Sequence, residues 1–598
     1  GHFGSSIPAG GQRMELLELR MIVAPTAPRL SQGRPPHSAL RRPAGVARAD
    51  GPRTGQAEAP AMGPQPLLQA GLGFAVGALT RGLRRGRQLR GLRHATVSAN
   101  TEVVRSLQPA QLFGHFAEIS SIPRPSRKEA AILRYIKDFA EARGLAWRED
   151  ATGNLLVIRP GSGGGEAAEP VMLQGHVDMV CEKNADTPHD FDADPIRLRV
   201  DCEWLRATGT TLGADNGVGV AAALAVLEQG PDATLPPIEA LFTVDEETGL
   251  TGAFGLDGSM VTATRLLNLD TEEFGSVYIG CAGGGNSTLH IEASPSEVDG
   301  DVATLALQVR GLLGGHSGIN IHEGRGNAVM MAAALAADVL AAIPEARLTA
   351  IEGGDKHNAI PREARAVVVV PSDSGDRVRA TVAQRGEALR TEFGLLEKSL
   401  TVAVEAAASS PGSVARAFSR ADSARIVSTM RVLPHGVVKM SHAMEGLVET
   451  SNNVASAHTS DSGVLITMST RSSIGSALED LRDRLQTVAE LASGSFERGP
   501  AYPGWAPVPS SPLVNLTLDK LAARSGAKPK VLAIHAGLEC GLLLEKCPSI
   551  SEAVSFGPTI TGAHSPDEAL EISTVQPFFQ ALMDILGDLA TGKPRSRL

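Results

Sequence analysis

Aromatic residues, cysteine and long apolar runs are all scarce in this sequence. Phe, Trp and Tyr make up 4% of its 598 residues, which disfavours a surface that stacks on nucleic-acid bases or sugars. The five cysteines are odd in number and too few for a disulfide framework, so a reducing compartment fits best. The apolar run LLQAGLGFAVGAL is shorter than the roughly 20 residues of a membrane-spanning helix. Because the net charge of -10 also opposes broad attraction to nucleic acid or anionic membranes, we expect no nucleic-acid partner and no membrane span.

Residues 1–100 differ from the rest of the chain in charge. They contain 14 Arg, no Lys and four acidic residues, although the whole chain is acidic. The stretch from Pro64 to Ala99 combines the apolar run with six arginines and no acidic residue, which is typical of an organelle transit peptide. An unstructured segment without a targeting role is the alternative. We expect a disordered leader over 1–100 and a cytoplasmic protein, or a plastid or mitochondrial one if the leader is a transit peptide.

From residue 101 onward, hydrophobic periodicity predicts alternating helices and strands. Apolar residues recur at helical spacing in 111–122, 128–143 and 218–229, and the second helix has Ser126 as its expected N-cap and Gly144 at its end. Short strand-like runs occupy 154–158, 171–173, 238–243 and 265–269. This alternation favours an α/β fold with a largely parallel sheet covered by helices.

Acidic and histidine residues follow several of these strands, where open α/β sheets bind their ligands. His176 and Asp178 end an apolar run, and as alternate residues of an extended chain they point to the same side. Asp215 stands in a glycine-flanked loop before a helix. Further runs with the same chemistry supply Glu246, Glu247, Asp270 and His564. An imidazole and a carboxylate for each metal, a carboxylate that bridges both, and spare carboxylates for acid/base work are the residues of a two-metal hydrolase.

Each of these residues also has an ordinary structural interpretation. A single histidine in a strand is usually a hydrogen-bonded core or surface residue, and an Asp-Glu-Glu run in a loop is usually a solvated turn or a helix cap. Five separate sites of the correct chemical type, each beside glycine or after an apolar run, are harder to explain in this way, because buried charges need partners. The combination therefore favours a metal centre.

Several runs resemble those of the aminoacyl-histidine dipeptidases, the bacterial peptidase D group. This group belongs to a zinc metallopeptidase clan that also contains carnosinases, aminoacylases and carboxypeptidases. The resemblance covers about residues 105–590 and implies an α/β, di-zinc aminopeptidase-like catalytic domain with an inserted α/β lid domain of the dimerisation type. The runs that carry it are GHVDMV, TTLGADNG, DEETGL, NLDTEE, GGHSG and GAHSPDE, with the linking segments KNADTPHDFDADPI and AIHAGLECG.

The resemblance implies a role for each candidate residue at the metal centre. It makes His176 and Asp270 ligands of one cation, Glu247 and His564 ligands of the other, and Asp215 the bridge between them. Asp178 would orient the imidazole of His176, and Glu246 would be the general base that moves a proton from water to the leaving amine. The two divalent cations are expected to be Zn²⁺, with Mn²⁺ and Co²⁺ as alternatives, because no thiolate is among the ligands.

The distance along the chain from Asp270 to His564 implies an insertion in the catalytic domain. We expect catalytic segments at 101–282 and 499–598 and a lid at 283–498. Within the lid, periodicity predicts strands at 302–310 and 364–370 and helices at 327–342, 376–392 and 474–491. In the related enzymes this domain closes on the substrate or mediates dimerisation, so a homodimer through the lid is expected.

Four further residues are assigned by the resemblance to the substrate. His316, between glycine pairs, would stabilise the oxyanion. Arg471 would bind the substrate carboxylate with its planar fork, and a surface salt bridge is its alternative role. His535 and Glu539 would line the pocket near the substrate amine or imidazole, and a structural His–Glu pair is the alternative.

The function implied is metal-dependent hydrolysis of dipeptides, including Xaa-His substrates such as β-alanyl-histidine. Two alternatives stay open. Enzymes of the same clan remove acyl groups from amino acids or trim single C-terminal residues, and a protein with this fold can also be a catalytically inactive binding protein. Retention of every expected ligand and of Glu246 speaks against the inactive protein.

Overall fold

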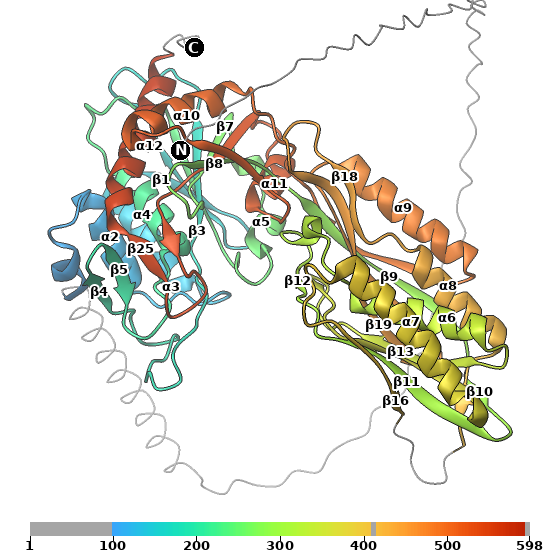
Figure 1. Ribbon diagram of the computed structural model, residues 1–598. Helices are drawn as coiled ribbons and strands as arrows, with labels where there is room; N and C mark the ends of the chain where they lie inside the picture. Colours follow the sequence, from blue (N-terminus) through green and yellow to red (C-terminus); the bar gives the residue numbers. More distant parts are fainter. Residues whose placement is uncertain (1–98, 408–413, 593–598) are drawn as a thin grey trace, which may run out of the picture. The chain divides into compact units, whose positions relative to one another are not determined.

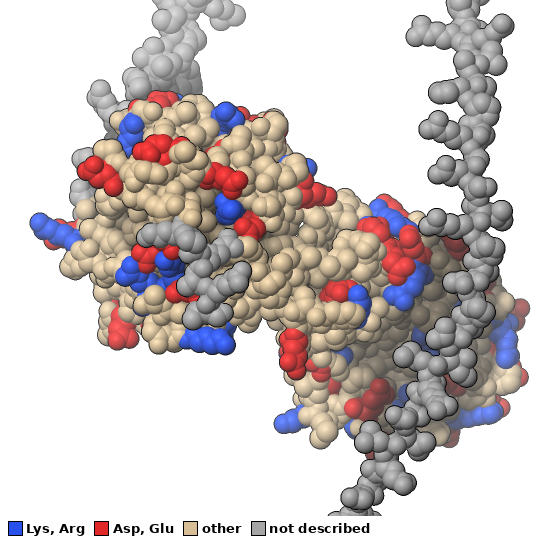
Figure 2. Space-filling model, turned by 90° about the horizontal axis from the view of Figure 1, so that it is seen from above, with Lys and Arg blue, Asp and Glu red and all other residues tan. Residues whose placement is uncertain are grey.

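The computed structural model describes residues 99–407 and 414–592 (Figure 1). Nearly all of the predicted leader therefore lies outside the described residues. No helix in the described ranges is both long and apolar enough to cross a membrane. On the described part of the face in Figure 2, basic and acidic side chains are interspersed.

The first sheet has eight strands and a mixed direction. Its central neighbours β6, β3, β7 and β23 run parallel, as predicted, whereas β1, β2 and β6 pair antiparallel at one edge. The short turn between β1 and β2 explains the direction of this pair, because a connection of a few residues permits only an antiparallel hairpin. Asp150 closes that turn by accepting hydrogen bonds from the backbone of residues 152–154. In spatial order the strands are β1 (Ala146–Glu149), β2 (Leu155–Arg159), β6 (Ile238–Thr243), β3 (Val171–His176), β7 (Arg265–Asn268), β23 (Glu552–Ser555), β8 (Ser276–Cys281) and β22 (Lys530–Ile534).

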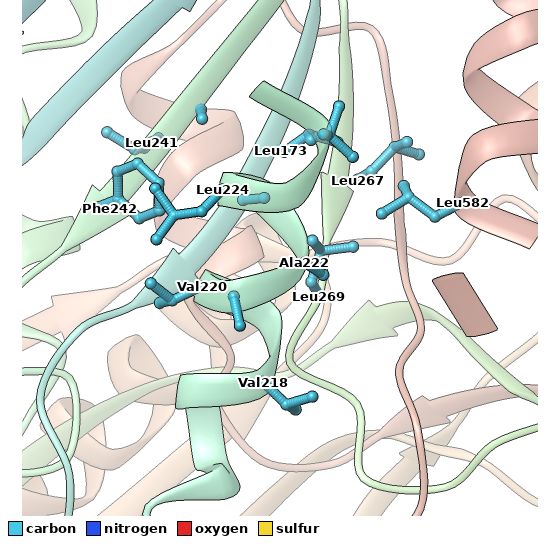
Figure 3. Packing of buried hydrophobic residues seen from close by; sticks show 14 of the residues in the cluster. Leu173, Val218, Val220, Ala222, Leu224, Leu241, Phe242, Leu267, Leu269 and Leu582 are labelled. Carbon is cyan, nitrogen blue, oxygen red and sulfur yellow. The ribbon is translucent and has the colours of Figure 1, made fainter. Parts of the chain in front are cut away.

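Buried strands and helices form the core around this sheet. Every residue of β3 and β6 is buried, which is the pattern of strands covered on both faces. Helix α4 packs against both strands, and Figure 3 shows Leu224 of this helix close to Phe242 of β6. The helices of this part include α2 (Ala110–Ser120), α3 (Ala130–Ala142), α4 (Ala214–Leu227), α5 (Thr251–Gly255), η1 (Gly258–Met260), α10 (Pro512–Ser525), α11 (Glu539–Lys546) and α12 (Ile572–Thr591).

The prediction that Ser126 caps the second helix is wrong. Helix α3 begins at Ala130 after Glu129, without a side-chain cap. Ser126 Oγ instead donates a hydrogen bond to Asp178 Oδ2 over 2.7 Å. The hydroxyl of Ser126 therefore donates to the buried carboxylate of Asp178 and does not cap the helix. The predicted end of the helix is confirmed, since Gly144 follows with a φ of 66°.

A small four-stranded sheet holds the C-terminal segment against the middle of the chain. Strand β25 (Ala569–Glu571) pairs with β5 (Trp204–Ala207), and their partners β24 (Ile560–Thr561) and β4 (Leu198–Asp201) complete the order β24, β25, β5, β4. Leu570 lies opposite Leu205 in this register, and both are fully buried. The pairing fixes the loop between β24 and β25, which carries His564.

The segment from residue 283 to residue 502 forms a second, antiparallel sheet with its own core. Its path is β16, β11, β15, β13, β19, β20, β9 and β21, and β18 pairs with β19 beside it. Helix α6 lies between α7 and α8 in one helical layer, and α9 packs on β9 and β20. This confirms the predicted α/β lid architecture, whereas the exact domain boundaries stay a prediction. The predicted strands and helices are found close to their expected ranges.

The described residues of this second part, 283–407 and 414–502, contain 19 helices and strands. They are β9 (Gly283–Glu292), β10 (Ser296–Glu297), β11 (Val302–Arg310), β12 (Gly315–His316), η2 (Ile321–Glu323), α6 (Ala328–Ala342), β13 (Arg347–Gly353), β14 (Ala359–Ile360), β15 (Ala364–Pro371), η3 (Ser372–Ser374), α7 (Gly375–Phe393), β16 (Thr401–Ala406), β17 (Arg416–Ala417), α8 (Arg420–Val432), β18 (Gly436–Met440), β19 (Val448–Ser460), β20 (Gly463–Ser472), α9 (Gly475–Leu491) and β21 (Ser495–Tyr502).

Candidate metal centre

The candidate ligands lie at the carboxyl ends of three adjacent parallel strands. Strand β3 ends at His176, β6 is followed by the loop with Glu246 and Glu247, and β7 is followed by Asp270. Since β3 lies between β6 and β7, these three ends meet at one edge of the sheet. Asp215 joins them from the start of α4, which packs on β3.

The carboxylate of Asp215 lies between two imidazoles. Its Oδ1 is 2.9 Å from Nε2 of His176, and its Oδ2 is 3.1 Å from Nε2 of His564. Nε2 of His176 is also 3.5 Å from Oδ1 of Asp270, and Nε2 of His564 is 3.0 Å from Oε2 of Glu247. The five residues therefore form two groups of ligand atoms that share Asp215.

These residues fit a pair of divalent cations. In each of the groups His176–Asp215–Asp270 and Asp215–Glu247–His564, the ligand atoms lie within 4.8 Å of one another. Among the described residues, Oε1 of Glu247 and Oδ1 of Asp270 are buried without a hydrogen-bond partner. Buried carboxylates of this kind need a positive charge. Nitrogen and oxygen donors without thiolate suit Zn²⁺, Mn²⁺ or Co²⁺.

The electrostatics of the two histidines reflect the surrounding acids. Hydrogen bonds from His564 to Asp215 and Glu247 raise the pKa of this imidazole to about 11. Burial opposes protonation of His176, yet the charge of Asp270 and the contacts with Asp178 and Asp215 raise its pKa well above the usual value. The site is therefore a strongly anionic environment in which a cation is stabilised.

Asp178 connects His176 with the loop after β6. Its Oδ1 lies 3.3 Å from Nδ1 of His176 and accepts a hydrogen bond from the backbone N–H of Glu246 over 3.1 Å. Its Oδ2 accepts from Ser126 and from the backbone N–H of Glu247. Although burial opposes ionisation, the contacts with His176 and Ser126 lower the pKa of Asp178 to about 2. One fully buried carboxylate thus touches two of the ligand-bearing segments.

Glu246 faces the same cluster. It offers an oxygen that lies within 4.8 Å of ligand atoms of His176 and Glu247. Burial raises its pKa well above the usual value, and the nearby acids Asp270 and Glu539 act in the same direction. A carboxyl group with a raised pKa beside a metal centre is suited to accept and return a proton.

A further acidic group near the centre has a structural explanation. Ligand atoms of Glu129, Asp178 and Asp245 also lie within 4.8 Å of one another. Oε1 of Glu129, however, accepts hydrogen bonds from the backbone N–H groups of Arg127 and Asp245, and Arg127 pairs with Asp245 over 3.2 Å. Protein donors therefore already satisfy this group, and we assign no metal to it.

Arg471 lies in β20 and is buried, with 6% of its surface exposed. Its Nη1 donates a hydrogen bond to the hydroxyl of Tyr502 over 3.0 Å, and its Nε has no hydrogen-bond partner among the described residues. No carboxylate of the described chain lies within 4 Å of its guanidinium. A surface salt bridge, the alternative role for Arg471, is therefore wrong.

Three histidines lie in the electrostatic environment of Arg471. Its charge lowers the pKa of His316 and of His357, after the larger effect of burial. Burial and then Arg471 lower the pKa of His535 to about 3, and Nε2 of His535 lies 2.7 Å from the hydroxyl of Ser451. The lowered pKa values favour the neutral form of all three imidazoles around Arg471. No hydrogen bond or ion pair in the described ranges joins His316 to the candidate metal ligands.

Glu539 begins α11 and is buried beside the candidate metal centre. Its Oε2 accepts hydrogen bonds from Nε2 of Gln174 over 2.5 Å and from the hydroxyl of Thr243 over 3.0 Å. Its Oε1 is buried without a partner among the described residues. Burial raises the pKa of Glu539 to about 6. His535 and Glu539 bond to different partners, which argues against a structural His–Glu pair.

Sequence reasoning missed several residues that belong to this site. Ser126, Gln174, Thr243, Ser451 and Tyr502 all contact candidate residues through polar side chains. Gln174 lies two residues before the end of β3, and Thr243 is the last residue of β6, so their position before His176 and Glu246 was an available signal. Ser451 and Tyr502 gave none, because nothing in the sequence marks which lid residues face Arg471.

Comparison with known proteins agrees with this arrangement. The model of peptidase family M20/M25/M40 matches residues 172–588. The cytosol non-specific dipeptidase of Escherichia coli is 40% identical over 483 residues, which cover 81% of this chain and 98% of that protein. The crystal structure of aminoacylhistidine dipeptidase from Vibrio alginolyticus is similar with a TM-score of 0.77 and 41% identity, covering 83% of this chain and 99% of that one. The predicted resemblance, fold class and metallodipeptidase character are confirmed, and the chain belongs to peptidase family M20/M25/M40.

Proposed function

We propose that this protein hydrolyses dipeptides, including Xaa-His dipeptides such as β-alanyl-histidine, with two divalent cations, preferably Zn²⁺. The observation that carries the proposal is the position of the Asp215 carboxylate between His176 and His564. His176 and Asp270 would hold one cation, Glu247 and His564 the other, and Asp215 both. When bound, two such cations lower the pKa of water and polarise the scissile carbonyl group.

Glu246 is proposed to move the proton. Its raised pKa supports this role, because a carboxyl group that is easily protonated can take a proton from the attacking water and return it to the leaving amine. The backbone of Glu246 is anchored by Asp178, which also lies against the ring of His176. Asp178 is therefore proposed to orient both the imidazole and the base.

His316 is proposed to donate a hydrogen bond to the oxyanion. Its Nδ1 accepts hydrogen bonds from the backbone N–H groups of Gly318 and Ile319 over 3.1 and 3.0 Å. A neutral imidazole that accepts at Nδ1 carries its proton at Nε2. Burial lowers the pKa of His316, which favours this neutral form. Nε2–H is thus the free donor that an oxyanion requires.

Arg471 and Glu539 are proposed to recognise the two ends of the dipeptide. Arg471 is a buried guanidinium without a carboxylate partner among the described residues, so the C-terminal carboxylate of a substrate would supply the missing charge. Glu539 has a buried oxygen to which no described residue donates, and this oxygen suits the free amino group at the other end. His535 is proposed to line the same pocket beside Arg471. Recognition of both ends limits the substrate to two residues.

A panel of matched substrates tests this function. Protein stripped with a chelator and reloaded with Zn²⁺, Mn²⁺ or Co²⁺ is assayed with three groups of substrates. They are the dipeptides β-alanyl-histidine, Ala-His and Ala-Ala with their C-terminal amides, the N-acetylated amino acids N-acetylalanine and N-acetylhistidine, and the tripeptide Ala-Ala-Ala. Hydrolysis of free dipeptides in the metal-loaded protein alone supports the proposal. Preference for N-acetylated amino acids supports an aminoacylase, and release of single C-terminal residues from longer peptides supports a carboxypeptidase. Absence of hydrolysis despite metal binding supports an inactive binding protein.

A homodimer through the lid and a cytoplasmic site of action are also proposed. The dimer follows from the lid's role in the related enzymes, and light scattering on the purified chain measures it directly. The name of the Escherichia coli relative supports the cytosol. A fluorescent fusion of the full chain, compared with one that begins at residue 99, distinguishes the cytosol from an organelle.

A further inference from the structure

Two buried charged residues outside the ligand set lie on either side of the loop that carries Asp215. Arg124 is 2% exposed and precedes α3, and Glu568 is 2% exposed and follows His564 by four residues. Neither side chain pairs with an opposite charge within 4 Å in the described part of the chain. Both are instead hydrogen-bonded to backbone groups of the ligand-bearing segments.

Glu568 binds the backbone on one side of this loop. Its Oε2 accepts hydrogen bonds from the N–H groups of Leu212 and Gly213 over 2.7 and 2.9 Å. Its Oε1 accepts from Ala214 over 2.7 Å and from Asp215 over 3.3 Å. One carboxylate thus takes four successive N–H groups at the start of α4. Because Glu568 shares a loop with His564, this contact joins the segments of Asp215 and His564.

Arg124 binds backbone carbonyl groups on the other side of the loop. Its Nη1 donates to the carbonyl oxygens of Val177 and Asp178 over 3.0 and 2.6 Å. Its Nη2 donates to the carbonyl oxygen of Gly213. Val177 directly follows His176, so this guanidinium joins the segments of His176 and Asp215.

Two glycines leave room for the guanidinium. A Cβ atom at Gly213 would lie 2.5 Å from Nη2 of Arg124, and one at Gly217 would lie 2.7 Å from the same atom. Gly213 also has a φ of 68°, which favours glycine. A side chain at either position would therefore collide with the guanidinium of Arg124.

We infer that Arg124 and Glu568 are positioning residues that set the spacing of His176, Asp215 and His564 for two cations. Each joins one pair of segments, and the loop of Asp215 is common to both. A ligand that must serve two cations tolerates little displacement. Loss of the hydrogen bonds of Arg124 or of Glu568 therefore weakens cation binding, although every ligand is still present. This inference rests on the proposed two-cation function of the site.

The test is Zn²⁺ binding to full-length protein stripped with a chelator, measured by calorimetry for Arg124→Lys and Glu568→Gln. An ammonium group cannot reach carbonyls of both segments, and an amide presents N–H groups to two N–H donors. We expect Zn²⁺ affinity to fall about 10- to 100-fold, as is usual when partners of ligands are replaced. We also expect the absorption spectrum of the Co²⁺-loaded variants to change, because the ligand geometry changes.

Two buried residues of the same part of the chain supply matched controls. Arg159 donates to the backbone carbonyls of Pro160 and Gln229, and Glu239 accepts from the backbone N–H groups of Thr262 and Ala263. None of these hydrogen bonds goes to the segments that carry His176, Asp215 or His564. Arg159→Lys and Glu239→Gln should lower the thermal midpoint of the metal-free protein and leave Zn²⁺ affinity and the Co²⁺ spectrum unchanged.

If Arg124→Lys does not fold, Gly217→Ala provides a second route. It keeps both charged residues but displaces the guanidinium, and it should weaken Zn²⁺ binding in the same way. Zn²⁺ affinity within twofold of wild type in the folded variants, or an equal loss in the two controls, overturns the inference. Wild-type protein that binds two cations but hydrolyses no dipeptide overturns the proposed function instead, so the two failures are distinguishable.

Discussion

Nε2 of His564 lies 3.1 Å from Oδ2 of Asp215, although 349 residues separate the two in the sequence. The small sheet that pairs β25 with β5 makes this contact, because it returns the C-terminal segment to the catalytic part of the chain. The inserted segment between them therefore does not disturb the centre.

Replacement of Glu246 should remove turnover and leave the metal content unchanged. Glu246→Gln keeps the size of the side chain but cannot accept the proton, so kcat should fall by about 10²- to 10⁴-fold. Metal analysis and dipeptide hydrolysis of the same preparation measure both quantities. Loss of both cations in this variant would show that Glu246 is a ligand.

Arg471→Ala should mainly raise KM for dipeptides, by about 10- to 100-fold, because a charged hydrogen bond to the substrate is lost. The effect should be much smaller for the C-terminal amide of the same dipeptide, in which the partner charge is already missing. Arg482→Ala is the control, since Arg482 is a buried lid arginine that bonds to the backbone at Asn286 and Gly499. Equal effects on free and amidated dipeptide would make Arg471 a structural residue.

His316→Ala should lower kcat by about 10²- to 10³-fold, as expected for loss of an oxyanion donor, with little change in KM or metal content. Steady-state kinetics at saturating Zn²⁺ separates these parameters. A change confined to KM would assign His316 to substrate binding. His316→Gln, which keeps an N–H donor, should retain more activity than His316→Ala.

The pH dependence of stability should carry a contribution from His535. Its pKa is about 3 in the folded protein, below the usual value of about 6.5 in an unfolded chain. The unfolded state therefore binds more protons between these values, and stability is lost as pH falls from 6.5 towards 3. The contribution amounts to about 2 kcal/mol between pH 7 and pH 5. Urea unfolding of wild type and His535→Gln at both pH values measures it, and identical pH dependence would show that His535 is not held neutral by burial.

The sequence predicted the loops with the candidate ligands because acidic and histidine residues directly follow the predicted strands there. His176, Asp270 and the Glu246–Glu247 pair each follow an apolar strand, so a general rule about parallel sheets placed them together. The antiparallel pairing of β1 and β2 was missed, since periodicity gives the strands but not their direction.

The supporting residues were harder to predict for a physical reason. Arg124 and Glu568 bind backbone atoms, and backbone atoms leave no pattern in a sequence. Ser126 looked like a helix cap because the local sequence permits it, whereas the buried carboxylate of Asp178 takes its hydroxyl. The partners of these side chains are thus more than 50 residues away along the chain, where local sequence patterns give no information.

Stepwise addition of Zn²⁺ to chelator-stripped protein, with dipeptide hydrolysis followed at each step, tests the two-cation centre most directly. Activity should rise to its maximum as two equivalents of Zn²⁺ bind, and Asp215→Ala should bind less Zn²⁺ and remain inactive, because both cations depend on this carboxylate. Full hydrolysis by the stripped protein, or a fully active Asp215→Ala variant, would contradict the account.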